Sequence, residues 1–247
     1  MSLSTRRCLA AITSHSHGLA DAARDNLEAE VEHCPGWTVA DLIWHVTEVH
    51  WFWKTIVAGS LASPPDESLR PQREPDHRLV QAFLAGVADL VDTLRAADQS
   101  TPVWTWATQK DVAFVTRHQV QEAAVHHWDA AFAASKEIVL EPDVAVDSIE
   151  EFLTFSLASA AEQAELGVDP LGQDLVLAST DGHGAWSIKD AAPEAPMTWV
   201  RGAEPGAATV SGTASELLLW LYDRTELPVR ADDDLLVERF RKLRFTS

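Results

Sequence analysis

A glutamate and a histidine stand four residues apart in the segment Glu122-Ala-Ala-Val-His126. If this segment is helical, the two side chains lie on one face, where a carboxylate and an imidazole can share a divalent cation. A distant segment supplies another imidazole, His45. Two imidazoles and one carboxylate would leave a coordination position open, which is typical of catalytic rather than structural zinc.

The same spacing has a plainer interpretation. Glutamate–histidine pairs four residues apart are common on solvated helix faces, where they bind water or each other and no metal. The neighbours of this pair favour a buried face, because Val120, Val125 and Trp128 are apolar. A buried carboxylate is costly unless it is paired or bound to a cation. The context therefore favours a metal site at Glu122 and His126 over a solvated pair.

Other histidines are less suited to the same cation. His118 lies one turn before Glu122 and can be a fourth ligand, a group that contacts a ligand, or a solvated residue; the last two are favoured. His127 projects about 100° around the helix from His126, so both cannot bind one ion from this face. The histidines without a partner pattern, which include His15, are expected on the surface.

Apolar residues recur at helical spacing in four long segments. They predict helices over about 3–31, 39–58, 76–97 and 112–134. Thr38 is a good N-cap for the second helix, with Asp41 placed close to a capping box. A proline-rich connection follows that helix, and the whole fits a four-helix bundle with one long crossover. A fifth helix, over 144–165, is expected to lead out of the bundle.

The pattern changes after Gly167. Strand-like runs at 174–180 and 185–188 flank Asp181-Gly182, whose turn chemistry predicts a β-hairpin. Two more short strands and two amphipathic helices are expected at 197–200, 208–210, 215–224 and 233–243. The sequence therefore predicts an α+β protein with two domains, a helical bundle over 1–166 and a small α+β domain over 167–247.

The composition excludes several classes of protein. The chain has 247 residues, and 38 acidic against 19 basic residues give a net charge of −19. So acidic a surface repels phosphate backbones and anionic membranes, which argues against a nucleic-acid or membrane partner. Two cysteines cannot form a disulfide framework, and no apolar run suits a membrane span or a signal peptide. We expect a cytoplasmic protein, and the oligomeric state stays open.

Three ordered motifs resemble those of a known family. The segment Pro35-Gly-Trp-Thr-Val-Ala-Asp-Leu-Ile-Trp-His45 resembles the PGWTVxDLxxH signature of the mycothiol-dependent maleylpyruvate isomerase family, whose members have a DinB-like helical bundle. A second element of that family resembles three segments here, Trp104–Trp106, Phe114–Arg117 and Glu122–Asp129. The segment Ser211–Arg224 resembles its vxGxAsdLLLwLwgR motif, so the resemblance covers nearly the whole chain.

This resemblance implies a metal and a thiol cofactor. The family's zinc ligands map onto His45, Glu122 and His126, so Zn²⁺ or another divalent metal is expected there. Mycothiol, a low-molecular-weight thiol, would be the nucleophile, and its sulfur would lie at or near the open position, where zinc favours the thiolate. In the isomerase reaction the thiolate adds to the double bond of maleylpyruvate, the resulting single bond rotates, and loss of the thiol gives fumarylpyruvate.

Arg224 is the family-matched candidate for a catalytic residue, because a guanidinium makes bidentate contacts to a substrate carboxylate. The alternative is a cation at a helix C-terminus that interacts with the macrodipole and nearby acids. The chain departs from the family pattern at Gln121, where histidine is usual, and at His118 and His127, where arginine is common. These changes remove no ligand but alter the charge beside the site, so the substrate stays open.

Four residues near the motifs have structural interpretations as well. Asp129 can orient a ligand histidine or cap a neighbouring helix. Cys34 is expected to be a small buried residue rather than a nucleophile. Trp37 and Trp44 are expected in the core of the bundle rather than in a pocket wall.

Two functions of different classes follow. The leading one is a zinc-dependent, mycothiol-using enzyme that isomerises or conjugates a small electrophilic substrate. The alternative is a non-catalytic metal-binding bundle with a structural, sensory or partner-binding role, and a helical scaffold without metal is a third. The ligand count separates the first two, because His118 as a fourth ligand would close the coordination sphere.

Overall fold

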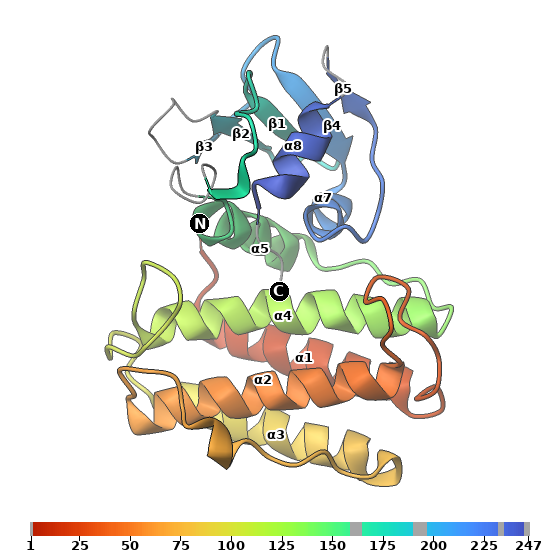
Figure 1. Cartoon of the computed structure of the whole chain (residues 1–247), viewed down its shortest axis with the longest axis vertical. Coiled ribbons are helices and arrows are strands. Elements are labelled where there is room, and N and C mark those ends of the chain that lie inside the picture. Colours follow the sequence, from red (N-terminus) through yellow and green to blue (C-terminus); the bar gives the residue numbers. More distant parts are fainter. Residues whose placement is uncertain (1, 159–164, 190–196, 232–234, 245–247) are drawn as a thin grey trace. The chain divides into compact units, whose positions relative to one another are not determined.

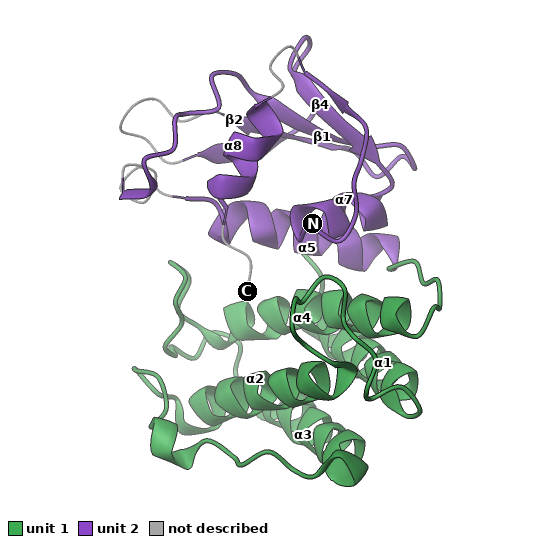
Figure 2. Ribbon diagram, turned by 45° about the vertical axis from the view of Figure 1, so that its right-hand side comes forward, with its two compact units in different colours: residues 1–140 green, residues 141–247 purple. Residues whose placement is uncertain are grey.

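The structure, a computed structural model, describes residues 2–158, 165–189, 197–231 and 235–244. The chain divides into two compact units, Met1–Leu140 and Glu141–Ser247, coloured separately in Figure 2. The first is helical and the second combines a sheet with helices, so the predicted α+β fold class is confirmed. The boundary between the units lies before the fifth helix, because that helix packs with elements of the second unit. The sequence suggested a boundary after that helix, near Gly167.

Four long helices form the first unit (Figure 1). They are α1, Thr5–Ala23; α2, Val39–Gly59; α3, Asp76–Ala96; and α4, Val112–Ala133. The helices α1 and α2 each pack against both α3 and α4, which encloses a shared core. A long connection that includes the 3₁₀ helix η1, Glu67–Leu69, joins α2 to α3. This is the bundle with one long connection that the periodicity predicts.

A capping box fixes the start of α2, as the sequence indicates. The Thr38 side chain accepts a hydrogen bond from the Asp41 backbone N–H, and the Asp41 carboxylate accepts one from the Thr38 N–H at 2.9 Å. Hydrogen bonds from the Thr38 backbone, then from the Arg73 and Thr38 side chains, lower the pKa of Asp41 to about 2. Such a cap stabilises a helix by about 1 kcal/mol. It also fixes where His45 lies along the bundle.

The first helix is shorter than its apolar pattern suggests. It ends at Ala23, whereas the prediction extended it to Val31. Asn26 follows, a residue type that favours turns, and its backbone N–H donates to the carbonyl of Ala23. An isolated bridge between Glu30 and Thr38 then closes the loop that leads into α2. The apolar residues of this stretch therefore pack from a loop rather than from a helix.

The second unit contains a five-stranded sheet of order β3-β2-β1-β4-β5. Its strands are β1, Leu175–Ser179; β2, Ala185–Lys189; β3, Thr198–Arg201; β4, Ala208–Gly212; and β5, Val229–Arg230. The predicted hairpin of β1 and β2 is confirmed, and β4 runs parallel to β1 on its other side. Of the strands that the structure describes, β5 alone was not predicted, because a two-residue strand shows no alternation.

Three helices whose bounds lie within the described residues accompany this sheet: α5, Pro142–Phe155; α7, Ala214–Leu221; and α8, Leu236–Lys242. The helices α5 and α7 pack together, and both contact the sheet. The prediction of one helix over 144–165 was wrong, because α5 ends at Phe155. Leu157 pairs instead with Arg244 in an isolated bridge, which takes the backbone out of the helix. Residues 159–164 lie outside the described part of the chain.

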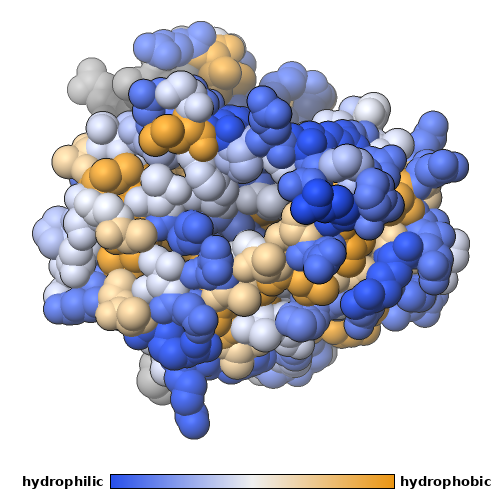
Figure 3. Space-filling view, turned by 90° about the horizontal axis from the view of Figure 1, so that it is seen from below, coloured by the Kyte–Doolittle hydropathy of each residue, from blue (hydrophilic) through white to orange (hydrophobic). Residues whose placement is uncertain are grey.

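Large apolar side chains lie within each unit. The most buried include Phe83 and Phe114 in the first unit and Trp186 and Trp220 in the second. Figure 3, a space-filling view from below, shows hydrophobic areas interspersed with hydrophilic residues on that face. None of the described helices combines the length and apolarity of a membrane span.

Candidate metal centre

The helix α4 carries polar side chains into the interior of the bundle. Its N-cap Asp111 accepts a hydrogen bond from the Phe114 backbone N–H at 2.9 Å. Glu122 and His126 lie in the middle of α4 and are only 5% and 4% exposed. The burial that the apolar neighbours of this pair predict is therefore present. Buried polar groups need partners, and those of Glu122 come from two helices.

His45 on α2 meets the pair on α4. Its Nε2 lies 3.4 Å from Oε1 of Glu122, and Nε2 of His126 lies 3.5 Å from the same oxygen. One ligand atom from each of these three residues lies within 4.8 Å of the other two. The structure thus brings together the three side chains that the helix geometry singled out.

The electrostatics of the cluster follow from this convergence. Burial by itself raises the pKa of Glu122, but hydrogen bonds and positive charge from His126 and His45 outweigh it and hold the pKa well below its usual range. Burial likewise lowers the pKa of His126, but hydrogen bonds to Asp129 and Glu122 raise it to about 9. Hydrogen bonds and charge therefore couple Glu122 to both imidazoles.

These residues fit a divalent cation by their donor chemistry. Two imidazole nitrogens and a carboxylate oxygen are the ligands that catalytic zinc sites use, and they converge here from two helices. Glu122 and His126 are buried, whereas the side chain of His45 is 30% exposed. The cluster is therefore accessible from the side of His45, where a further ligand can approach.

Residues 8–131 match the family model described as the mycothiol maleylpyruvate isomerase N-terminal domain. The match covers half of the chain and includes all three residues of the cluster. The chain belongs to this family.

Solved structures support the same fold for most of the chain. A crystal structure of the mycothiol-dependent maleylpyruvate isomerase matches with a TM-score of 0.62 at 15% identity, over 92% of this chain and 93% of that chain. A crystal structure of a mutant of that isomerase matches equally well. No curated protein matches the chain. At this low identity, the likeness shows the fold of both units and leaves the reaction to be argued from the site.

In this member of the maleylpyruvate isomerase family, a second donor group borders the first. Asp129 is buried, and its Oδ2 lies 2.9 Å from Nδ1 of His126 and 3.9 Å from Sγ of Cys34. Both groups use His126, and a neutral imidazole has one nitrogen lone pair to give. Because Asp129 accepts the Nδ1 proton, the lone pair lies at Nε2, toward Glu122 and His45. This favours the first group over the second.

The other candidate histidines do not belong to either donor group. His118 is buried, stacks on Phe114 at 5.3 Å, and has Nδ1 3.2 Å from the amide nitrogen of Gln121. It is therefore not solvated, and it is absent from the donor groups of the described residues. His127 points elsewhere, with Nδ1 3.1 Å from Nδ1 of His15. The expectation that His15 lies on the surface was wrong, because it packs between helices.

Arg224 follows α7 in the second unit and is 9% exposed. Its Nη1 donates a hydrogen bond to the carbonyl of Tyr222 at 2.7 Å. The catalytic role that the resemblance implies for Arg224 stays a proposal.

Three residues near the cluster differ from expectation. Trp37 and Trp44 are half-buried rather than core residues. The Trp37 ring lies 4.9 Å from the ring of His45, between centroids. Cys34 is also half-buried, and its thiol contacts Asp129. The sequence does not indicate these contacts, because a contact between a loop and two helices has no periodicity.

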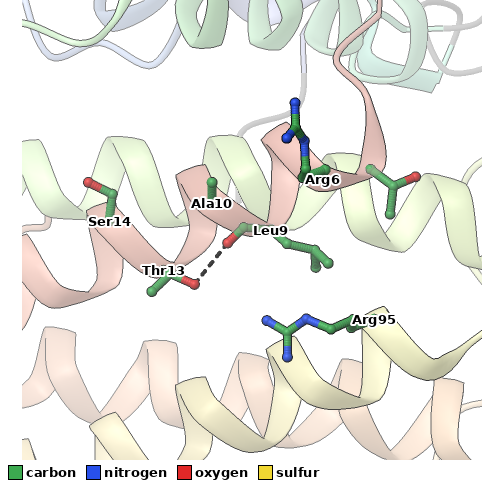
Figure 4. A pocket seen from close by; sticks show the side chains of 7 residues that line it. Arg6, Leu9, Ala10, Thr13, Ser14 and Arg95 are labelled. Atoms are coloured by element: carbon green, nitrogen blue, oxygen red, sulfur yellow. Dashed lines mark hydrogen bonds between the residues drawn. The ribbon is translucent and has the colours of Figure 1, made fainter.

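A hollow of about 640 Å³ lies elsewhere, on the outer side of α1 facing α3. Figure 4 shows Leu9 and Thr13 on the side of Arg95, whereas the guanidinium of Arg6 points away from it. Arg95 pairs with Asp92. The hollow contains none of the candidate ligands and gathers no converging charges, so it supports no binding site.

Proposed function

We propose that this protein is a metal-dependent, mycothiol-using enzyme that acts on a small electrophilic substrate, by cis–trans isomerisation or by thiol transfer. The observation that carries the proposal is the convergence of His45 and His126 on one carboxylate oxygen of Glu122, in a chain of the maleylpyruvate isomerase family. Three protein ligands with one exposed member suit a site that accepts another ligand during a reaction.

The ligands we propose are His45, Glu122 and His126, and the metal is Zn²⁺ or another divalent cation. When bound, the metal would lower the pKa of an incoming thiol and so favour its reactive thiolate form. Glu122 offsets part of the cation's charge. Asp129 accepts the Nδ1 proton of His126, which keeps Nε2 available as a ligand. Because His45 is the partly exposed ligand, we propose that thiol and substrate approach from its side.

We further propose that Arg224 holds a carboxylate of the substrate. Its guanidinium is rigid and remains charged, and the contact with the Tyr222 carbonyl restricts its orientation. Substitution by lysine keeps the charge but removes the planar fork. Arg224→Lys should therefore raise KM for a dicarboxylate substrate at least tenfold while leaving metal content unchanged. An unchanged KM would assign Arg224 to the support of its own unit.

The test of the metal proposal is elemental analysis of protein purified without chelator. We expect about one divalent ion per chain in the wild type, and almost none in His45→Ala or Glu122→Gln. His17→Ala is the matched control, because His17 belongs to neither donor group of the described residues. A wild type without metal would overturn the proposal. A metal that survives in both ligand variants would place the ion elsewhere.

The thiol proposal needs a separate measurement. Isothermal titration of mycothiol into metal-loaded and metal-free protein should give binding that depends on the metal. Equal binding to both forms would contradict a role for the open position. Metal binding without any thiol binding or turnover would instead favour a non-catalytic metal-binding bundle.

A further inference from the structure

The loop before α2 contains a tight turn, Cys34-Pro35-Gly36-Trp37. The backbone N–H of Trp37 donates to the carbonyl of Cys34 at 3.0 Å, and Gly36 has a φ of +84°. Proline at the second position and a left-handed glycine at the third are what a type II β-turn requires. The sequence Pro-Gly therefore fixes the directions in which the residues at the two ends of the turn project.

Each end of this turn contacts a different half of the candidate metal centre. At one end, Sγ of Cys34 lies 3.9 Å from Oδ2 of Asp129, the carboxylate that accepts the Nδ1 proton of His126. At the other end, the indole of Trp37 lies 4.9 Å from the imidazole of His45, at an interplanar angle of 54°. One four-residue turn thus contacts both the carboxylate that holds His126 and the ring of His45.

Apart from their contacts with this turn, the two imidazoles differ in the number of polar groups that hold them. His126 is buried and has two polar partners, Asp129 and Glu122. His45 is 30% exposed, and its one polar contact among the described residues is Nε2 to Glu122. Ring contacts with Trp37 and with His126, the latter at 5.3 Å and 82°, supply the rest of its support. The orientation of His45 therefore rests on ring contacts, including the one with Trp37, as well as on its single polar contact with Glu122.

The backbone of the turn is itself fixed. The carbonyl of Trp37 accepts a hydrogen bond from the Val31 N–H at 2.9 Å, and the capping residue Thr38 follows directly. The turn is therefore tied to the start of α2, the helix that carries His45. A shift of the turn would move the indole relative to the imidazole it contacts.

We propose that the Cys34–Trp37 turn is a positioning element of the metal centre, in which Trp37 orients the exposed ligand His45 and Cys34 supports Asp129. This inference rests on the proposed metal site. Trp37 acts through His45 and is a positioning residue, not a ligand. Aromatic pairs of this kind contribute enough to change an equilibrium about threefold to tenfold.

The first experiment measures zinc affinity by competition with a chromophoric chelator. Trp37→Leu should raise the dissociation constant of Zn²⁺ about tenfold, and Trp37→Phe, which retains a ring, should restore it to within about twofold of the wild type. Trp44→Leu is the matched control, because Trp44 is also half-buried and adjacent to His45 but no ring contact with it is described. Equal affinity of Trp37→Leu and wild type, or equal losses in both leucine variants, would overturn the proposal.

The second experiment tests the turn itself. Gly36→Ala and Gly182→Ala both place a Cβ at a left-handed position, with φ of +84° and +86°, and neither Cβ meets an atom within 4 Å. Both variants should lose thermal stability through backbone strain. Only Gly36→Ala should also weaken zinc binding, by about tenfold. Equal zinc affinity in the two variants would overturn the proposal, whereas a wild type that binds no zinc would instead overturn the metal site.

Discussion

Nδ1 of His126 lies 2.9 Å from Oδ2 of Asp129, and both side chains are buried on the same helix. This hydrogen bond sets the tautomer of the imidazole, because a proton on Nδ1 leaves the lone pair on Nε2. The nitrogen that faces Glu122 is thereby made the donor to a cation. In this way Asp129, without binding the metal itself, would favour binding of the metal at His45, Glu122 and His126 over the neighbouring donor group.

Asp129→Asn should weaken the affinity of the centre for zinc. The amide has the same shape as the carboxylate, but it is neutral and a poorer acceptor, so the Nδ1 proton is held less firmly. Loss of such a partner costs about 10–100-fold in metal affinity. A chelator competition assay measures this, with circular dichroism to establish that the fold is retained. Wild-type affinity in a folded Asp129→Asn protein would contradict the assigned role.

The cobalt-substituted protein should report on the thiol. Without added thiol, its spectrum should lack intense sulfur-to-metal charge transfer, because the favoured donor group contains no sulfur. Mycothiol should introduce such absorption. The same result is expected in Cys34→Ser, which removes the only sulfur of either donor group in the described part of the chain. Charge transfer present before thiol addition and absent in Cys34→Ser would show that the metal binds at Cys34 instead.

The sequence predicts those parts of the fold that local rules control. The limits of α2 follow from Thr38 and Asp41 at one end and Gly59 at the other, and α4 from its apolar pattern. The prediction was wrong where a contact between distant segments sets the end of an element. The end of α5 depends on Leu157 pairing with a residue near the C-terminus, which no local pattern shows.

The same distinction applies to the candidate metal centre. Glu122 and His126 are one turn apart on one helix, so their proximity follows from helix geometry alone. That His45 joins them required the bundle topology, which the crossover suggested. The contact of Trp37 with His45 joins a loop to a helix, and the depth of a half-buried indole depends on neighbours that periodicity does not reveal.

His50 should make the stability of the protein sensitive to mild acid. It is 1% exposed, it stacks on Phe83, and neither ring nitrogen has a hydrogen-bond partner among the described residues. Burial lowers its pKa to about 4, although the charge of Glu122 opposes this and that of His45 adds to it. The unfolded chain takes up a proton near pH 6.5, whereas the folded protein resists it until about pH 4.

The free energy of unfolding should therefore fall as the pH falls from about 6.5 to about 4, by on the order of 3 kcal/mol from this group. His50→Leu should remove that part of the slope. Urea unfolding at a series of pH values, with excess chelator present, compares the two proteins. Parallel stability curves for wild type and His50→Leu would show that His50 is not buried in the neutral form.

Two glycine substitutions should change stability in opposite directions. A Cβ on Gly18 in α1 would overlap the ring of His127, which also lies against His15. A Cβ on Gly86 in α3 would meet no atom within 4 Å. Gly18→Ala should therefore destabilise the protein by about 1–3 kcal/mol through overpacking, whereas Gly86→Ala should stabilise it by about 0.5–1 kcal/mol through helix propensity. Thermal unfolding of both measures the contrast. Because alanine favours a helix equally at either position, a stabilising Gly18→Ala would mean that His127 does not occupy the space between α1 and α4.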